Sequence, residues 1–258
     1  MSATQIGPDV NCNRRHAVTL IELLVIVGVL VFVIAMLFPA LSKAQRQSRT
    51  VTCLSNLHQL YMGYAAYLPL NQQQSLRYDT TESAFWPNVL RPTFPDVKDI
   101  LLCPEASAPS YGLGTDKTSW GPYDRAHGSP ASMAFIGNTS SSYGFNGWLY
   151  AGEDETFTNR LFRTHLADRV PVFAESNWVD GWPPRSEGAG RELPPPALAA
   201  GAGLSRFELA RHGQSINASF LDGHSEQIPL DRLSELKWSL PPRPQPGELH
   251  RGTSWETR

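Results

Sequence analysis

The chain has 258 residues, of which 41% are apolar and 18% are charged, and its formal net charge at neutral pH is −2. This length allows one sizeable core or two small ones. The balanced charge and the lack of a basic stripe with interleaved aromatic residues argue against a nucleic-acid partner. Low charge together with 20 glycines and 21 prolines suits an exported, β-rich domain.

An apolar segment near the N-terminus is the first element along the chain. Residues 19–38 contain one charge, Glu22, and as a helix they are long enough to cross a bilayer. A secretory signal would use Arg14 and Arg15 and a small-residue cleavage site at 42–44, but such signals have shorter apolar regions and no carboxylate at their start. A plain membrane anchor fits the length but gives Glu22 no role, because a carboxylate within a bilayer is costly.

A third interpretation adds a cleavage step in front of the apolar segment. The stretch RRHAVTLIELLV resembles the leader of type IV prepilins, in which a short basic segment and a small residue precede an apolar residue, T-L-I-E and a long apolar helix. The resemblance implies a leader at 1–17, which a prepilin peptidase removes between Ala17 and Val18 before methylating the new amine. The family usually has glycine where this chain has Ala17. The residues that the peptidase and the assembly would recognise are Thr19, Leu20, Ile21 and Glu22.

This resemblance gives Glu22 a function. Glu22 lies four residues, or about 6 Å along a helix, from the amine that cleavage would create on Val18. A neighbouring subunit that is shifted by this distance would bring the carboxylate and the ammonium together. We therefore expect the pair to set the register between subunits.

The apolar segment continues into a longer predicted helix that spans 18–68. Pro39 lies at the end of the apolar run, where proline removes a backbone donor, and in pilin-like proteins a proline at the corresponding place kinks the helix. Beyond it, apolar residues at spacings of three and four predict a core-facing stripe. The stripe consists of Val51, Leu54, Leu57, Tyr61, Tyr64 and Leu68.

The segment 69–240 is predicted to form the globular domain. Short apolar runs bounded by glycine, proline and asparagine predict strands within 99–103, 141–150 and 170–176. Long turn-rich loops at 104–140 and 181–205 separate them. The Pro-rich residues 241–258 are predicted to be a disordered tail.

The stretch RHGQSINASFLDGHSEQI (211–228) contains the second motif. Nine residues separate His212 from Asp222 and Gly223, and Asp-Gly between two apolar runs predicts a hairpin with a type I′ turn within 212–228. The stretch resembles the prepilin-type processing-associated H-X9-DG domain. We interpret His212 as a structural hydrogen-bonding residue and Asp222 as a turn residue. A metal or acid–base site formed with His224 and Glu226 is the less favoured alternative, because no catalytic motif accompanies these residues.

Two cysteines remain in the mature chain if a leader that contains Cys12 is removed. Cys53 and Cys103 can form a disulfide in an oxidising compartment, or they can remain two buried thiols. They have neither a C-x-x-C arrangement nor the spacing of a zinc site. We therefore expect no metal and no cofactor.

Together these features predict an α+β, pilin-like protein, whose long N-terminal helix packs on an antiparallel β-sheet domain with long loops. The resemblance implies a structural pseudopilin or minor pilin of a type II secretion-like or type IV pilus-like assembly, not an enzyme. Its partners would be the prepilin peptidase and methylase, other pilin-like subunits and membrane lipid. It would cross the bacterial inner membrane once, with its C-terminal domain periplasmic or extracellular. The alternative is a membrane-anchored binding domain that does not assemble.

Overall fold

The computed structural model describes residues 19–78, 85–93, 100–151, 166–184 and 203–239. The chain divides into two compact units, residues 1–45 and 46–258. The helices are α1 (Leu20–Leu70) and α2 (Trp86–Leu90), and short 3₁₀ segments connect several strands. The strands are β1 (Ala108–Pro109), β2 (Thr118–Ser119), β3 (Tyr143–Asn146), β4 (Pro171–Glu175), β5 (Asp180–Gly181), β6 (Ser215–Phe220) and β7 (Ser225–Pro229). The predicted leader at 1–17 and the tail at 241–258 lie outside the described residues.

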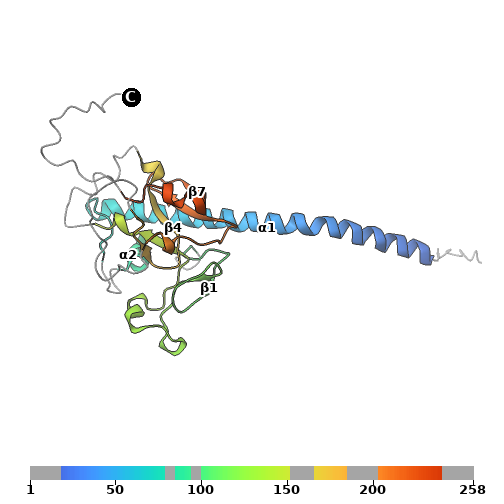
Figure 1. The fold of residues 1–258 in the computed structure, drawn as a ribbon, viewed down its shortest axis with the longest axis horizontal. Helices are drawn as coiled ribbons and strands as arrows, with labels where there is room; N and C mark the ends of the chain where they lie inside the picture. Colours follow the sequence, from blue (N-terminus) through green and yellow to red (C-terminus); the bar gives the residue numbers. More distant parts are fainter. Residues whose placement is uncertain (1–18, 79–84, 94–99, 152–165, 185–202, 240–258) are drawn as a thin grey trace, which may run out of the picture. The chain divides into compact units, whose positions relative to one another are not determined.

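Helix α1 is continuous over 51 residues, which confirms the predicted long N-terminal helix (Figure 1). The apolar residues of its first half are exposed, and within the described residues α1 is the one helix that is long and apolar enough to cross a membrane. Pro39 lies inside α1, and the kink expected there stays a prediction.

The second half of α1 provides one side of the core, but its buried face differs from the predicted stripe. Val51 is 60% exposed and Leu54 is only partly buried, so the predicted start of the stripe is wrong. The buried face instead begins at Cys53, and Val51 and Leu54 lie off it. Its buried members are Cys53, Asn56, Leu57, Leu60, Tyr61, Gly63, Tyr64 and Leu68.

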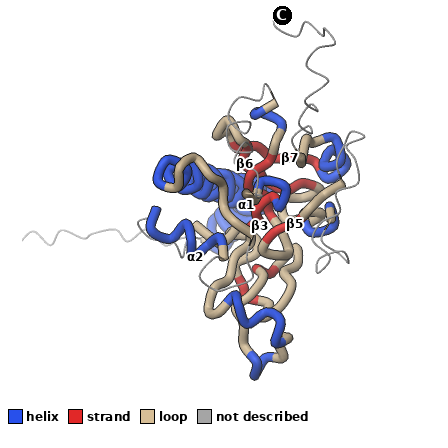
Figure 2. Tube along the Cα trace, turned by 90° about the vertical axis from the view of Figure 1, so that its left-hand side faces the viewer, coloured by secondary structure: helices blue, strands red, loops and turns tan. Residues whose placement is uncertain are grey.

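The main sheet has five strands in the order β5-β3-β4-β6-β7. The pairs β3–β4, β4–β6 and β6–β7 are antiparallel, whereas β5 pairs with β3 in parallel, so the expectation of an antiparallel sheet is only partly correct. The chain leaves β4, crosses the end of β3 and returns on its other side, where the Phe145 amide donates to the Val179 carbonyl over 2.9 Å. The sheet lies beside the second half of α1 in both views (Figure 1 and Figure 2).

Two of the three predicted strand regions contain strands of this sheet, namely β3 and β4. The third is wrong, because residues 100–103 form a turn. Its carbonyls are bonded outside any ladder: the Leu101 carbonyl accepts from the Ser142 amide, and the Leu102 carbonyl accepts from the Asn56 side chain. The residues that were expected to be only loops at 104–140 include β1 and β2, which pair in parallel.

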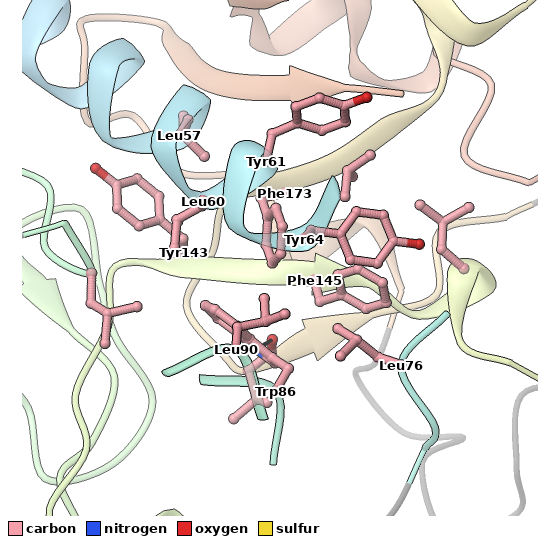
Figure 3. Packing of buried hydrophobic residues seen from close by; sticks show 14 of the residues in the cluster. Leu57, Leu60, Tyr61, Tyr64, Leu76, Trp86, Leu90, Tyr143, Phe145 and Phe173 are labelled. Carbon is pink, nitrogen blue, oxygen red and sulfur yellow. Dashed lines mark hydrogen bonds between the residues drawn. The ribbon is translucent and has the colours of Figure 1, made fainter. Parts of the chain in front are cut away.

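Apolar side chains fill both faces of the sheet. On the face toward α1, the ring of Tyr64 lies 5.6 Å from that of Phe145 and 6.2 Å from that of Phe173, and Trp86 of α2 packs 5.1 Å from Phe173 (Figure 3). On β6, alternate residues point away from α1 into a second cluster, which contains Ile216, Ala218, Phe220, Phe207 and Trp238.

Candidate functional site

Four side chains with metal-binding or acid–base chemistry meet beneath the second half of α1. Cys53 belongs to α1, Cys103 follows the turn at 100–102, Glu175 ends β4, and His212 precedes β6. Their ligand atoms all lie within 4.8 Å of one another. Cys53, Cys103 and Glu175 are fully buried, and the His212 side chain is 1% exposed. We call these four residues the Cys-Glu-His cluster.

Secondary structure positions each member of the cluster. Cys53 lies on the buried face of α1. Glu175 lies two residues after Phe173 on β4, so both side chains point to the sheet face that α1 covers. The turn that carries His212 is held by a hydrogen bond of 3.2 Å from the His212 amide to the Ser215 carbonyl. The site is therefore supported by a helix, a central strand and a strand terminus rather than by one loop.

His212 is the centre of the cluster. Its Nε2 lies 3.4 Å from Cys103 Sγ and 3.3 Å from Glu175 Oε1, and its Nδ1 lies 3.0 Å from Thr50 Oγ1. The Thr50 hydroxyl already donates its one proton to the Arg46 carbonyl over 3.1 Å. Thr50 must therefore accept from His212, which places a proton on Nδ1 and turns Nε2 toward Cys103 and Glu175.

Glu175 uses its two oxygens differently. Oε2 accepts from the Asn217 amide over 2.9 Å. Oε1 is buried and accepts no hydrogen bond from the residues that the structure describes, although His212 Nε2 is near and Arg211 Nη1 lies 4.0 Å away. A buried carboxylate oxygen without a hydrogen bond is unusual in a folded protein.

The cluster shifts the pKa values of its members. Burial lowers the pKa of His212, but the hydrogen bond with Cys103 and the nearby Glu175 carboxylate outweigh burial and raise it to about 10. Burial likewise opposes the charged form of Glu175, but His212 and Arg211 bring the pKa of Glu175 below its ordinary value. Burial raises the pKa of Cys53 well above that of a free thiol, whereas hydrogen bonds from Cys53 and then His212 lower the pKa of Cys103. The metal-free cluster therefore contains an imidazolium next to a carboxylate.

The cluster combines groups that can transfer protons, form a disulfide or bind a metal ion. Substrate chemistry would require access, and all four side chains are buried. Cys53 and Cys103, which the sequence suggests as a disulfide pair, do lie close together, but in the structure both are free thiols. Two sulfurs, an imidazole nitrogen and a carboxylate oxygen form a donor set that suits zinc.

Sequence spacing conceals this donor set. Cys53 and Cys103 are 50 positions apart, Glu175 follows 72 positions later, and His212 another 37. Zinc motifs that can be read from sequence place two ligands within a few residues. The one available signal was His212 in the H-X9-DG motif, and nothing local connected it with the cysteines.

The structure separates the residues that the sequence groups around His212. The Nδ1 of His224 lies 2.6 Å from Asp222 Oδ1 at the turn, where both side chains are more than a third exposed. Glu226 is also exposed. The alternative site of His212 with Asp222, His224 and Glu226 is therefore wrong, because His212 faces the cysteines instead.

The hairpin is confirmed, but its turn differs from type I′. Its loop has three residues, Leu221, Asp222 and Gly223, and of these only Gly223 has a positive φ, at 95°. The Gly223 amide donates to the Phe220 carbonyl, and the Phe220 amide donates to the His224 carbonyl. This is the pattern of a type I turn followed by a left-handed residue. Leu221, the first residue of this loop, is buried in the core.

The hairpin loop docks on α1. The hydroxyl of Tyr61 donates to the Leu221 carbonyl over 2.6 Å, and His58 Nδ1 lies 2.9 Å from the Gly223 carbonyl. A Cβ on Gly223 would lie 2.9 Å from Tyr61 Cε1, so the glycine also permits a close approach. The H-X9-DG motif thus joins the C-terminal hairpin to the N-terminal helix at both ends, through His212 and through Gly223.

The described part of the proposed processing region begins at Thr19. Ala17 and Val18 lie outside the described residues. Thr19 and Glu22 form a reciprocal cap: the Thr19 amide and hydroxyl each donate to Glu22 Oε2 over 2.9 Å, and the Glu22 amide donates to the Thr19 hydroxyl over 3.2 Å. This T-x-x-E capping box gives Glu22 a role within its own helix, in addition to the pairing predicted from the sequence.

Comparisons of the chain with protein-family models, curated proteins and solved structures give no match.

Proposed function

We propose that the chain is a structural, pilin-like subunit that is anchored by the first half of α1 and processed between Ala17 and Val18. The observation that carries the proposal is the difference in exposure between the two halves of α1. Its first half exposes apolar residues and lies in one compact unit, whereas its second half lies in the other unit and forms part of that unit's core. A subunit that is stored in a membrane and assembles through its helix needs both properties.

The exposed half of α1 requires a nonaqueous environment. Nearly every residue from Leu20 to Phe38 is a large apolar side chain, and contiguous apolar surface of this extent is rarely left in water. A bilayer before assembly and neighbouring helices after assembly would both cover it. The proposed location is the bacterial inner membrane, with the second unit in the periplasm or outside the cell.

Glu22 has two functions in this proposal. Both hydrogen bonds from Thr19 end on Oε2, so Oε1 can accept from a further donor. The donor that we propose is the Val18 amine of a neighbouring subunit. The cap would hold the carboxylate at the helix start, where the amine reaches it.

The mature N-terminus is the decisive measurement for processing. The full chain would be isolated from membranes of a host that contains a prepilin peptidase, and its N-terminal peptide identified by mass spectrometry. The expected result is N-methylvaline at Val18. An intact N-terminus would contradict the proposal and favour a membrane-anchored binding domain that does not assemble, and a start at Gln45 would indicate a secreted protein.

Two substitutions separate the ion pair from the cap. Glu22→Gln retains a side chain that can complete a capping box but removes the charge, whereas Thr19→Ala removes the cap and retains the charge. If Glu22 pairs with an amine, Glu22→Gln reduces the amount of assembled fibre at unchanged membrane insertion, and Thr19→Ala has the smaller effect. The opposite order would show that Glu22 acts only as a helix cap.

The partners follow from this role. They are a prepilin peptidase and methylase, other pilin-like subunits and membrane lipid, in a type II secretion-like or type IV pilus-like assembly. In this proposal, chemistry is done to the chain by the peptidase, and the chain itself is not an enzyme.

A further inference from the structure

We propose that the Cys-Glu-His cluster binds one zinc ion, with Cys53 Sγ, Cys103 Sγ, His212 Nε2 and Glu175 Oε1 as its ligands. The site would be structural, because four protein ligands complete a tetrahedral shell and leave no position for a substrate. The inference does not depend on processing of the N-terminus or on assembly.

The distances suit tetrahedral coordination. Zinc bonds of about 2.3 Å to sulfur and about 2.0–2.2 Å to nitrogen and oxygen place the ligand atoms about 3.4–3.8 Å apart. Nε2 of His212 lies 3.4 Å from Cys103 Sγ and 3.3 Å from Glu175 Oε1, close to these values. No pair of ligand atoms is more than 4.8 Å apart, so side-chain shifts of about 1 Å would close the shell.

Glu175 Oε1 is an independent indication of a ligand. This oxygen is fully buried, and no described residue donates a hydrogen bond to it; its contact is the ion pair with His212 Nε2 at 3.3 Å. A buried carboxylate oxygen without a hydrogen bond is unusual. A metal ion between Oε1 and Nε2 would supply the missing partner.

The groups around the cluster hold the ligands in the form that zinc requires. Because Thr50 accepts from His212 Nδ1, the neutral imidazole has its lone pair on Nε2, toward the cluster. The Asn217 amide fixes Glu175 through Oε2 and leaves Oε1 for the metal. The hydroxyl of Tyr143 donates to Cys53 Sγ over 3.3 Å, as donors commonly do to a metal-bound thiolate.

The charges also balance. Two thiolates and a carboxylate carry three negative charges, and a divalent ion leaves one. The guanidinium of Arg211, which is fully buried and lies 4.0 Å from Glu175 Oε1, neutralises the remainder. Zinc binding displaces the two thiol protons and any proton on Nε2 to solvent, and no oxidation or reduction takes place.

The first test measures metal in the wild-type chain. The full chain would be purified in mild detergent without chelators or metal-affinity resin, and zinc counted by inductively coupled plasma mass spectrometry. We expect about one zinc ion per chain. The proposal would be overturned by a zinc content below about a tenth of an ion per chain that stays this low after the thiols are reduced and zinc is added. A disulfide between Cys53 and Cys103 in the chain as isolated would also overturn it.

Cobalt substitution tests the geometry and the ligands. Co²⁺ bound to two thiolates in a tetrahedral site shows sulfur-to-metal charge transfer in the near ultraviolet and intense visible bands. Weak bands typical of six-coordinate cobalt, without charge transfer, would contradict the assignment. This measurement needs no substitution, so it decides the proposal even if variants of the buried cluster do not fold.

A matched pair of histidine variants tests the ligand assignment. His212→Gln is expected to reduce bound zinc at least tenfold and to abolish the cobalt spectrum, whereas His224→Gln, at the exposed turn of the same motif, should retain both. Circular dichroism would establish that the variants are folded. Equal zinc content in the two folded variants would refute the role of His212.

Discussion

The buried side chain of Arg211 contacts several backbone carbonyls, and replacing it with lysine tests how the globular unit is held together. The residue is 2% exposed, and its guanidinium makes five hydrogen-bond contacts with four backbone carbonyls; three of them share the two N–H groups of Nη2. These carbonyls belong to Thr115, Thr118, Ser142 and Ser176. Arg211 thus joins the β1–β2 region to residues beside β3 and β4.

The cost of Arg211→Lys follows from this count. The guanidinium uses four N–H groups for these contacts, whereas a lysine ammonium has three on one atom, so at least one bond must be lost. A hydrogen bond from a charged group contributes about 1.5–3 kcal/mol, which gives an expected loss of at least about 1.5–3 kcal/mol in the free energy of unfolding. Lysine keeps the positive charge near Glu175, so the loss in free energy of unfolding reports the missing N–H donors of the guanidinium rather than a change in charge.

Guanidinium chloride unfolding of the full chain in nonionic detergent would measure this loss. All seven tryptophans follow residue 85, so their fluorescence reports the globular unit alone. The control is Arg232→Lys, because the Arg232 side chain is 65% exposed and pairs with the neighbouring, exposed Glu235; we expect a change below about 0.5 kcal/mol. If the free energy of unfolding of Arg211→Lys lies within about 1 kcal/mol of the wild-type value, the hydrogen bonds of the guanidinium do not stabilise the globular unit as argued.

Three further substitutions in the globular unit have expected effects. Gly223→Ala should lower the free energy of unfolding by about 1–3 kcal/mol, because alanine is strained at a φ of 95° and its Cβ would displace Tyr61. Burial raises the pKa of Asp180 from 3.8 to about 6 despite the hydrogen bond from Tyr150. The stability that Asp180 contributes is therefore fully present below pH about 4 and is lost as the pH rises to about 6. Between these pH values the free energy of unfolding of Asp180→Asn should rise by about 3 kcal/mol relative to that of the wild type. Asn146→Asp removes both N–H donors to the Pro171 and Trp238 carbonyls and should cost about 2–6 kcal/mol.

The chain offers a control for each of these predictions. Gly213 also has a positive φ, at 78°, but no atom lies near its Cβ position, so Gly213→Ala should cost less than Gly223→Ala. Equal losses would show that the approach of Tyr61 is unimportant. A pH dependence that is the same for Asp180→Asn as for Asp231→Asn, at an exposed aspartate, would contradict the burial argument. Asn71→Asp, at an exposed asparagine, should be nearly neutral, and a similar loss there would point to added charge instead.

Local signals were enough to predict α1 and the hairpin. The apolar run and the three-and-four spacing identify α1, because a helix repeats on a scale of a few residues. The buried face was misplaced at Val51 and Leu54, since spacing alone does not show where the sheet begins to cover the helix. The hairpin was located from Asp222 and Gly223, but local sequence did not show that Leu221 also belongs to the loop and that its side chain packs in the core.

The Cys-Glu-His cluster was beyond the reach of local signals. Its members come from a helix, a turn, a strand and a strand terminus, and only the sheet order β3-β4-β6 brings Glu175 near His212. Glu175 in particular ends a short apolar strand, where a carboxylate ordinarily marks the point at which a strand reaches solvent. Its complete burial can be known only from what packs on the sheet.

The contacts between the hairpin and α1 also impose an order on folding. The three hydrogen bonds that join Thr50, His58 and Tyr61 to the hairpin region bridge 162, 165 and 160 positions. Closing a flexible loop of this length costs about 4.5 kcal/mol in chain entropy, before any contact compensates for it. Helix α1 is synthesised early, and its contacts with the β6–β7 hairpin can form only after the hairpin has been synthesised near the end of the chain. Until the hairpin arrives, Tyr61 and its apolar neighbours on α1 lack the cover that Leu221 and Gly223 give them in the folded unit.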